Sequence, residues 1–131
     1  MIVLDTHVII WHALQPNLLS RKAKSMIAKA NDTDGMIFCE ISLWEIAMLM
    51  QKRRLNIDTS YLNFIDLLKT ANSYLFRGIS PKIAELSTTL PAEITCDPAD
   101  RIIAATAILE NAHLITADKN LRNAKSIETL W

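Results

Sequence analysis

The first six residues constrain the fold more than any other stretch of the chain. Residues 2–4 are all apolar, without alternation between apolar and polar positions. Such a run is typical of a strand in a parallel sheet that is covered on both faces. Asp5 follows directly, and an apolar helical pattern then covers residues 8–14. An acid at this point lies at the carboxyl edge of the sheet, where open α/β folds bind ligands. Asp5 is therefore either a helix cap or part of a site.

Strands and helices alternate along the rest of the chain. This order predicts an α/β fold, a three-layer α/β/α sandwich with a central, mainly parallel sheet. With 131 residues and no repeat or linker, we expect a single domain over residues 1–131. We predict further strands at 36–39, 74–79, 113–116 and 127–130, and helices that begin near Ser20, Ser42, Asp58 or Thr59, Ser80, Asp97 and Asp118.

Charge and cysteine content narrow the function classes. Lys and Arg together number 14, and so do Asp and Glu. The chain therefore lacks the net positive charge that is typical of many nucleic-acid-binding proteins. The spacing of Cys39 and Cys96 matches no zinc or redox motif, and we expect both thiols to be reduced and mostly buried. Neither a signal peptide nor an apolar stretch of about 18 residues is evident. We therefore expect a cytoplasmic protein that does not enter the membrane.

At four places an acid follows a predicted strand or lies in the first turn of the next helix. These acids are Asp5, Glu45, Asp100 and Asp118. Since parallel strands end at one edge of a sheet, the four carboxylates can converge there. Clustered carboxylates repel one another unless a cation intervenes, and an all-oxygen cluster selects Mg²⁺ or Mn²⁺ over zinc. Such an ion can activate water and neutralise charge on a phosphoryl group.

Each acid taken alone also has a structural explanation. Ser42 to Glu45 has the form of a capping box, and acids in a first helical turn complement the helix dipole. Asp97 precedes Pro98, and we interpret it first as an N-cap. Capping does not require all four acids to follow buried strands. The set therefore indicates a site more strongly than any of its members.

Four blocks of this sequence, residues 2–7, 41–46, 97–107 and 114–118, resemble the signature blocks of the PIN-domain nucleases. The similarity covers essentially the whole chain, and it is greatest to the VapC-like ribonuclease toxins of type II toxin–antitoxin pairs. The resemblance implies a PIN-like sandwich and an endoribonuclease that depends on Mg²⁺ or Mn²⁺. It further implies an RNA substrate, a homodimer and a cognate antitoxin protein. By position it assigns catalytic roles to Asp5, Glu45, Asp100 and Asp118, metal ligation to Asp5, Asp100 and Asp118, and supporting roles to Thr6, Asp97 and Thr116.

Other functions fit the sequence less well. A haloacid-dehalogenase-type phosphatase needs a second acid two residues after the strand-end Asp, where this chain has His7. A receiver-like signalling domain needs paired acids after the first strand and a Lys after the last, and neither is clearly present. A PIN-fold interaction module without catalysis is a further alternative, which the intact set of four acids argues against.

Partner surfaces are also indicated. The helix over residues 43–50 is apolar almost all round, which predicts burial on more than one side and a two-fold homodimer. A remaining apolar groove would take an antitoxin segment, from which a basic side chain could pair with the four acids. Residues 52–54, with Arg101 and Lys119, would supply local positive charge for RNA.

Overall fold

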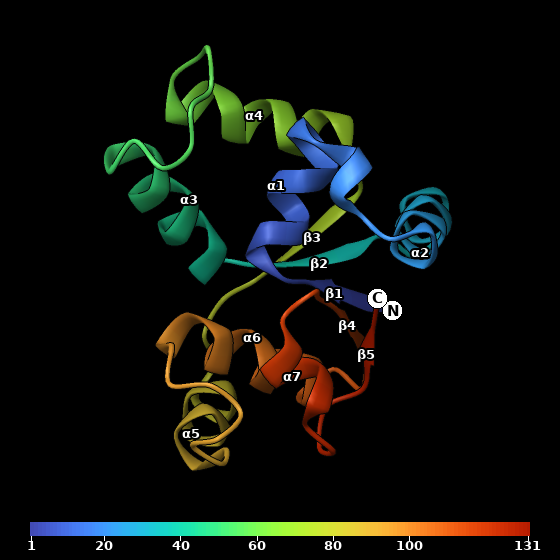
Figure 1. Ribbon diagram of the computed structural model, residues 1–131, viewed down its shortest axis with the longest axis vertical. Helices are drawn as coiled ribbons and strands as arrows, with labels where there is room; N and C mark the ends of the chain where they lie inside the picture. The colour runs from blue at the N-terminus through green and yellow to red at the C-terminus, as the bar shows by residue number, and fades with distance from the viewer.

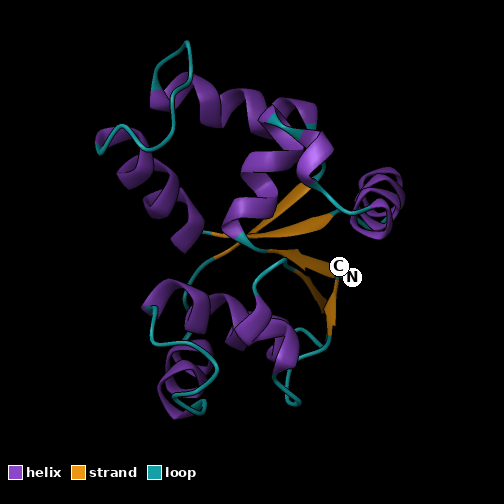
Figure 2. Ribbon diagram, viewed as in Figure 1, coloured by secondary structure: helices purple, strands orange, loops and turns teal.

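The computed structural model describes residues 1–131 and contains a five-stranded sheet between two layers of helices (Figures 1 and 2). Every pair of neighbouring strands is parallel, which confirms the predicted α/β architecture. The order β3-β2-β1-β4-β5 differs from the 2-1-3-4-5 order of receiver domains, so the receiver alternative is wrong. The strands are β1 (Ile2–Leu4), β2 (Met36–Cys39), β3 (Tyr74–Arg77), β4 (His113–Ile115) and β5 (Thr129–Leu130).

Helices cover both faces of the sheet (Figure 1). No helix is both long and apolar enough to cross a membrane. One face carries α1 (Thr6–Leu14), the 3-10 helix η1 (Pro16–Leu18), α2 (Arg21–Asp32), α3 (Ile41–Gln51) and α4 (Tyr61–Ala71), and the other carries α5 (Pro81–Thr89), α6 (Pro98–Leu109) and α7 (Lys119–Asn123).

The central strand β1 is buried on both faces, as its sequence predicts. Ile2 and Leu4 belong to the core beneath α1 to α4, whereas Val3 points the opposite way into the core beneath α5 to α7. Successive side chains of a strand alternate between the two faces of a sheet, so a run without alternation contributes to two cores. The end of β1 is therefore held rigidly from both sides.

Serine caps set the starts of three helices. The Oγ of Ser20 accepts from the amide of Ala23 at 3.0 Å and begins α2, and Ser80 begins α5 in the same way. Both starts confirm the sequence prediction. The predicted start at Asp58 or Thr59 is wrong, because Ser60 caps α4.

Two further predictions need correction. Cys39 is buried in β2, and burial raises its pKa to about 12, but Cys96 is exposed in the loop before α6. The strand predicted over residues 74–79 ends at Arg77, since its partner β2 ends at Cys39 and offers no further ladder positions.

Candidate active site

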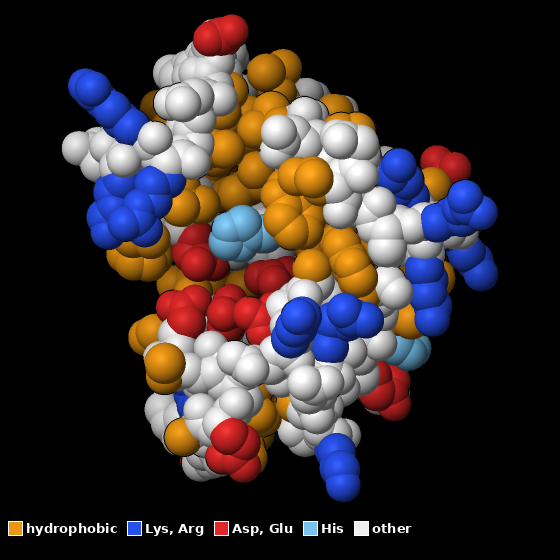
Figure 3. Space-filling view, in the orientation of Figure 1, with side chains coloured by type: hydrophobic (Ala, Val, Ile, Leu, Met, Phe, Trp, Pro, Cys, Tyr) orange, Lys and Arg blue, Asp and Glu red, His pale blue; other side chains and the backbone are white.

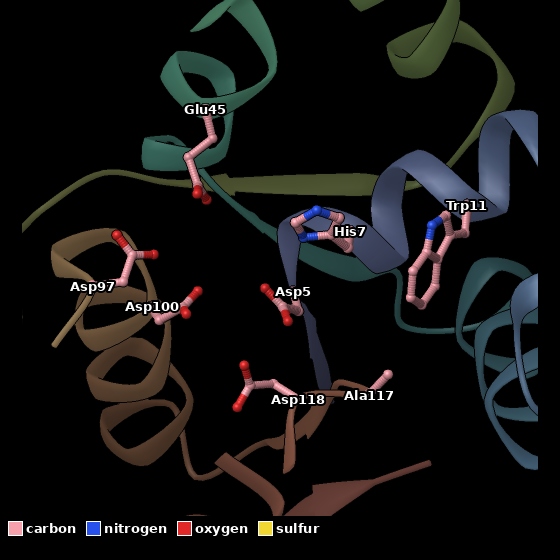
Figure 4. A pocket seen from close by; sticks show the side chains of 8 residues that line it. All are labelled: Asp5, His7, Trp11, Glu45, Asp97, Asp100, Ala117 and Asp118. Carbon is pink, nitrogen blue, oxygen red and sulfur yellow. The ribbon is translucent and has the colours of Figure 1, made fainter. Parts of the chain in front are cut away.

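The site lies where the strand order reverses. β1 is hydrogen-bonded to β2 on one side and to β4 on the other, so the chain after β1 and the chain after β4 leave the same edge of the sheet side by side. Open α/β sheets bind ligands at this switch point. A cavity of about 330 Å³ lies there, and carboxylates from four different parts of the chain point into it (Figure 4). Its lining is Asp5, His7, Trp11, Glu45, Asp97, Asp100, Ala117 and Asp118.

Asp5 is the buried centre of this pocket, with 7% of its surface exposed. Its Oδ1 accepts a hydrogen bond of 2.8 Å from the amide of Thr6, and its Oδ2 accepts one of 2.7 Å from the hydroxyl of Thr116. Burial raises the pKa of the Asp5 carboxyl, and the bond from Thr116 opposes the shift most strongly. The two bonds fix the orientation of the carboxylate, and Asp5 is also the N-cap residue of α1.

Thr116 joins Asp5 to Asp118. While its hydroxyl donates to Asp5, it accepts a 3.1 Å hydrogen bond from the amide of Asp118. Asp118 in turn uses Oδ1 to accept from the amide of Leu121 at 3.0 Å, which caps α7. The structural explanation of Asp118 as a cap therefore applies, while its Oδ2 makes no hydrogen bond and the residue lines the pocket.

Glu45 is oriented by α1 and not by a capping box. The predicted box is wrong, because α3 already begins at Ile41 and places Ser42 inside the helix. The Thr6 hydroxyl donates to Oε1 of Glu45. The Ser42 hydroxyl lies 2.7 Å from that of Thr6, and since a hydroxyl carries one hydrogen, Ser42 donates to Thr6. Burial raises the pKa of Glu45, and the bond from Thr6 opposes this.

Sequence reasoning missed the contribution of Ser42. The spacing could have indicated this contribution, because residues three apart share a helix face and Ser42 precedes Glu45 by three positions. The two side chains consequently meet Thr6 together, and the fully buried Ser42 supports Glu45 through that residue.

Asp97 and Asp100 enter the pocket from the start of α6. Asp97 occupies the predicted N-cap position, but its carboxylate makes no capping bond and faces the pocket instead (Figure 4). Asp100 stands in the first turn. Burial raises its pKa to about 8, with further increases from the neighbouring charges, Asp5 first among them. In the absence of a cation, the pKa of Asp100 therefore lies well above the usual range of an Asp carboxyl.

The sequence predicts that Arg101 supplies positive charge for RNA, and in the structure its side chain has a structural role. Its guanidinium donates to the backbone carbonyls of Ser87 at 2.8 Å and Thr95 at 2.9 Å, and also to those of Leu90 and Pro91. These bonds tie the loop between α5 and α6 to the first turn of α6. Arg101 thereby fixes the segment that carries Asp97.

His7 and Trp11 form the rim of the pocket opposite α6 (Figure 4). Their rings lie 6.0 Å apart. His7 does not pair with His12, which contacts Asn72 at 3.2 Å on the far side of α1.

The chemical types of the donors in the pocket suit a hard divalent cation, but their present spacing does not form an ion site. Its polar lining consists of carboxylates from Asp5, Glu45, Asp97, Asp100 and Asp118, with His7 at the rim. Oxygen ligands of this kind select Mg²⁺ or Mn²⁺, and a cation would relieve the repulsion that raises the pKa of Asp100. In the structure no group of three His, Cys, Asp or Glu side chains is close enough to hold one ion.

A parallel α/β sandwich with several carboxylates at its switch point defines the class of protein. Comparison with known families identifies that class, since the PIN domain family matches residues 2–127. The chain therefore belongs to the PIN domain family, whose VapC nucleases generally depend on divalent metal. It is 34% identical to Ribonuclease VapC22 of Mycobacterium tuberculosis, over 99% of this chain and 98% of that protein.

Solved structures share the fold at lower identity. VapBC2 from Rickettsia felis, bound to a DNA fragment from its promoter, matches with a TM-score of 0.72 and 18% identity over 99% of this chain and 98% of that one. A toxin–antitoxin complex from Klebsiella pneumoniae matches with a TM-score of 0.68 and 22% identity over 97% of this chain and 95% of that one. FitAcB from Neisseria gonorrhoeae matches with a TM-score of 0.64 and 19% identity over 99% of this chain and 96% of that one. These structures support the predicted PIN-like sandwich.

Proposed function

We propose that this chain is a metal-dependent endoribonuclease and the toxin of a type II toxin–antitoxin pair. The observation that carries the proposal is the convergence of Asp5, Glu45, Asp100 and Asp118 in one pocket at the sheet's switch point. The similarity to Ribonuclease VapC22 supports RNA as the substrate. A PIN fold without catalysis would have no need for Thr6 and Thr116 to orient two of these carboxylates.

The catalytic roles follow from the hydrogen bonds. Asp5, Asp100 and Asp118 would hold Mg²⁺ or Mn²⁺, and the bound ion supplies positive charge that stabilises the phosphoryl group during hydrolysis. Thr116 orients Asp5, and the capping bond orients Asp118. Glu45 Oε1 accepts from Thr6, which leaves Oε2 to take a proton from the attacking water. Asp97 adds negative charge at the rim.

A circular RNA tests the reaction type, because only an endonuclease can open it. We expect linear product in Mg²⁺ or Mn²⁺, and none in EDTA. The Glu45→Gln variant should cut slower by on the order of 100-fold, since it keeps the shape of the side chain but loses the proton acceptor. Linear product in EDTA at the same rate would contradict the metal requirement.

A homodimer is the second part of the proposal. Within one copy, only Ser42 and Ile46 of α3 are buried, so the predicted burial of this helix on more than one side requires a second copy. Trp44 is 58% exposed, and Leu43, Ala47 and Met48 beside it are half-buried. An apolar surface of this kind on a small protein is typical of an interface. A two-fold dimer would cover it on both copies.

A cognate antitoxin is the third part, supported by the toxin–antitoxin complexes that share this fold. A separate apolar groove of about 360 Å³ between α1 and α4 fits a partner segment. Leu14, Ile57 and Phe64 line it, and Leu67 at its edge is 54% exposed. A basic side chain from that segment would pair with the acidic pocket. With RNA as substrate, the expected location is the cytoplasm.

A further inference from the structure

A cationic hollow lies beside the acidic pocket. It has a volume of about 400 Å³ and is lined by Lys22 of α2 and by Lys119 and Arg122 of α7, with no acid among its lining residues. All three cations are exposed, and the two ion pairs of the chain involve other residues. Figure 3 shows Lys and Arg side chains over the start of α7, directly next to the acidic hollow. None of the three cations forms an ion pair within the chain, so the group is available to an anion.

Aromatic rings connect the hollow to the acidic pocket. Trp131 lines the hollow, and its ring lies 5.9 Å from that of Trp11, which lines the acidic pocket. Trp11 in turn lies 6.0 Å from His7 on the same rim. Both tryptophans are half-buried, so each keeps part of its surface open to a ligand. Lys119 also follows Asp118 directly in the chain, which makes the acidic and the cationic sites continuous.

Single-stranded nucleic acid matches this combination. Proteins bind such strands through cations that follow the phosphates and aromatic rings on which bases stack. A duplex cannot use the rings, because its bases are already stacked and paired. Resting on the proposed function, we propose that single-stranded RNA runs from the acidic pocket along Trp11 and Trp131, with its phosphates on Lys22, Lys119 and Arg122.

The test separates binding from cleavage. Binding is measured by fluorescence anisotropy with a labelled single-stranded RNA of random sequence, in Mg²⁺, in an Asp100→Asn background that prevents cleavage. The variants are a Lys119→Gln/Arg122→Gln pair, Lys22→Gln and Trp131→Leu. Lys24→Gln is the matched control for Lys22, because Lys24 is an exposed cation of the same helix that lies outside the hollow. Trp131→Phe keeps a ring and controls for Trp131→Leu.

The plot of log affinity against log salt has a negative slope, and the paired variant should make it shallower by about 1.4. Each lost phosphate contact on a single strand contributes about 0.7 to the size of this slope. Lys22→Gln should lower it by about half as much, and Lys24→Gln should leave it unchanged. Trp131→Leu should weaken binding of the single strand about tenfold, whereas Trp131→Phe restores most of the affinity. Neither change at Trp131 should alter the binding of duplex RNA.

Equal affinity and equal salt slope for the parent and the paired variant would overturn the inference, even if Trp131→Leu fails to fold. That result leaves the proposed function intact as long as the unmodified chain still opens circular RNA. A chain that binds single-stranded RNA through the hollow but cuts no RNA would support the inference and contradict the proposed chemistry. A chain that binds no single-stranded RNA contradicts both.

Discussion

The hydroxyl of Thr116, at the end of β4, donates a 2.7 Å hydrogen bond to Oδ2 of Asp5, at the end of β1. The bond joins residues 111 positions apart across the switch point of the sheet. It opposes the effect of burial, which raises the pKa of Asp5. The same hydroxyl accepts from the amide of Asp118, so one side chain positions two of the proposed metal ligands.

Replacing Thr116 with the isosteric Val removes both bonds and leaves a buried carboxylate less satisfied. We expect the free energy of unfolding to fall by about 1–3 kcal/mol and RNA cleavage to slow, as measured by urea unfolding and initial rates. Thr106→Val is the matched control, because the buried hydroxyl of Thr106 donates to the carbonyl of Ile102 and the residue does not line the acidic pocket. If both variants retain parental cleavage rates, Thr116 does not position Asp5.

Metal-free stability should depend on pH through Asp100. Its pKa is raised from 3.8 in the unfolded chain to about 8 in the folded one, so between these values the folded chain binds more protons. The free energy of unfolding in EDTA should therefore decrease as pH rises from about 4 to about 8. Asp100→Asn should flatten this dependence in urea titrations, whereas the exposed Asp66→Asn should not. A stability that rises with pH across this window would contradict the proposed environment of Asp100.

A divalent metal should offset the cost of holding charged carboxylates in the buried pocket. Binding of Mg²⁺ or Mn²⁺ to the folded state alone raises the Tm, and the rise should be larger at pH 8 than at pH 6 because the ligands must lose their protons. Asp5→Asn should reduce the rise in thermal melts with millimolar Mg²⁺. A melting temperature that does not respond to metal at either pH would be evidence against the ligand set of Asp5, Asp100 and Asp118.

The exposed face of α3 should form the homodimer. Light scattering on the purified chain at micromolar concentration should give the mass of two copies. Trp44→Glu should give one copy, because it places a charge in the apolar surface. Leu18→Glu on η1 is the control, since Leu18 is 46% exposed but lies away from α3. A parental monomer would contradict the dimer and the role of this helix.

The main features of the fold and site could be predicted because they depend on local patterns. Short apolar runs without alternation identify β1 and β2, and Ser20 and Ser80 identify two helix starts. The convergence of the acids then follows from parallel pairing, since strand ends meet at one edge. That residues 1–131 form one domain stays a prediction, and the structure has a single sheet with a core on each face.

Other features depend on contacts between distant segments. The sequence around Ser42 fits a capping box, but the chain enters α3 directly after β2, so the hydroxyl meets Thr6 instead. Arg101 could equally face RNA or the protein, and only the path of the loop before α6 decides between them. The contact between Trp11 and Trp131, at opposite ends of the chain, has no local signal.

The most direct test of the account is RNA cleavage by Asp5→Asn beside Asp66→Asn in Mg²⁺ or Mn²⁺. Both variants remove one carboxylate, but Asp5 lies at the centre of the pocket and Asp66 is exposed on α4. Circular dichroism is used to check that both proteins are folded. The account predicts that Asp5→Asn cuts slower than the parent by on the order of 100-fold or more, whereas Asp66→Asn cuts at the parental rate. A folded Asp5→Asn protein that cuts RNA as fast as the parent would contradict the assignment of this pocket as the active site.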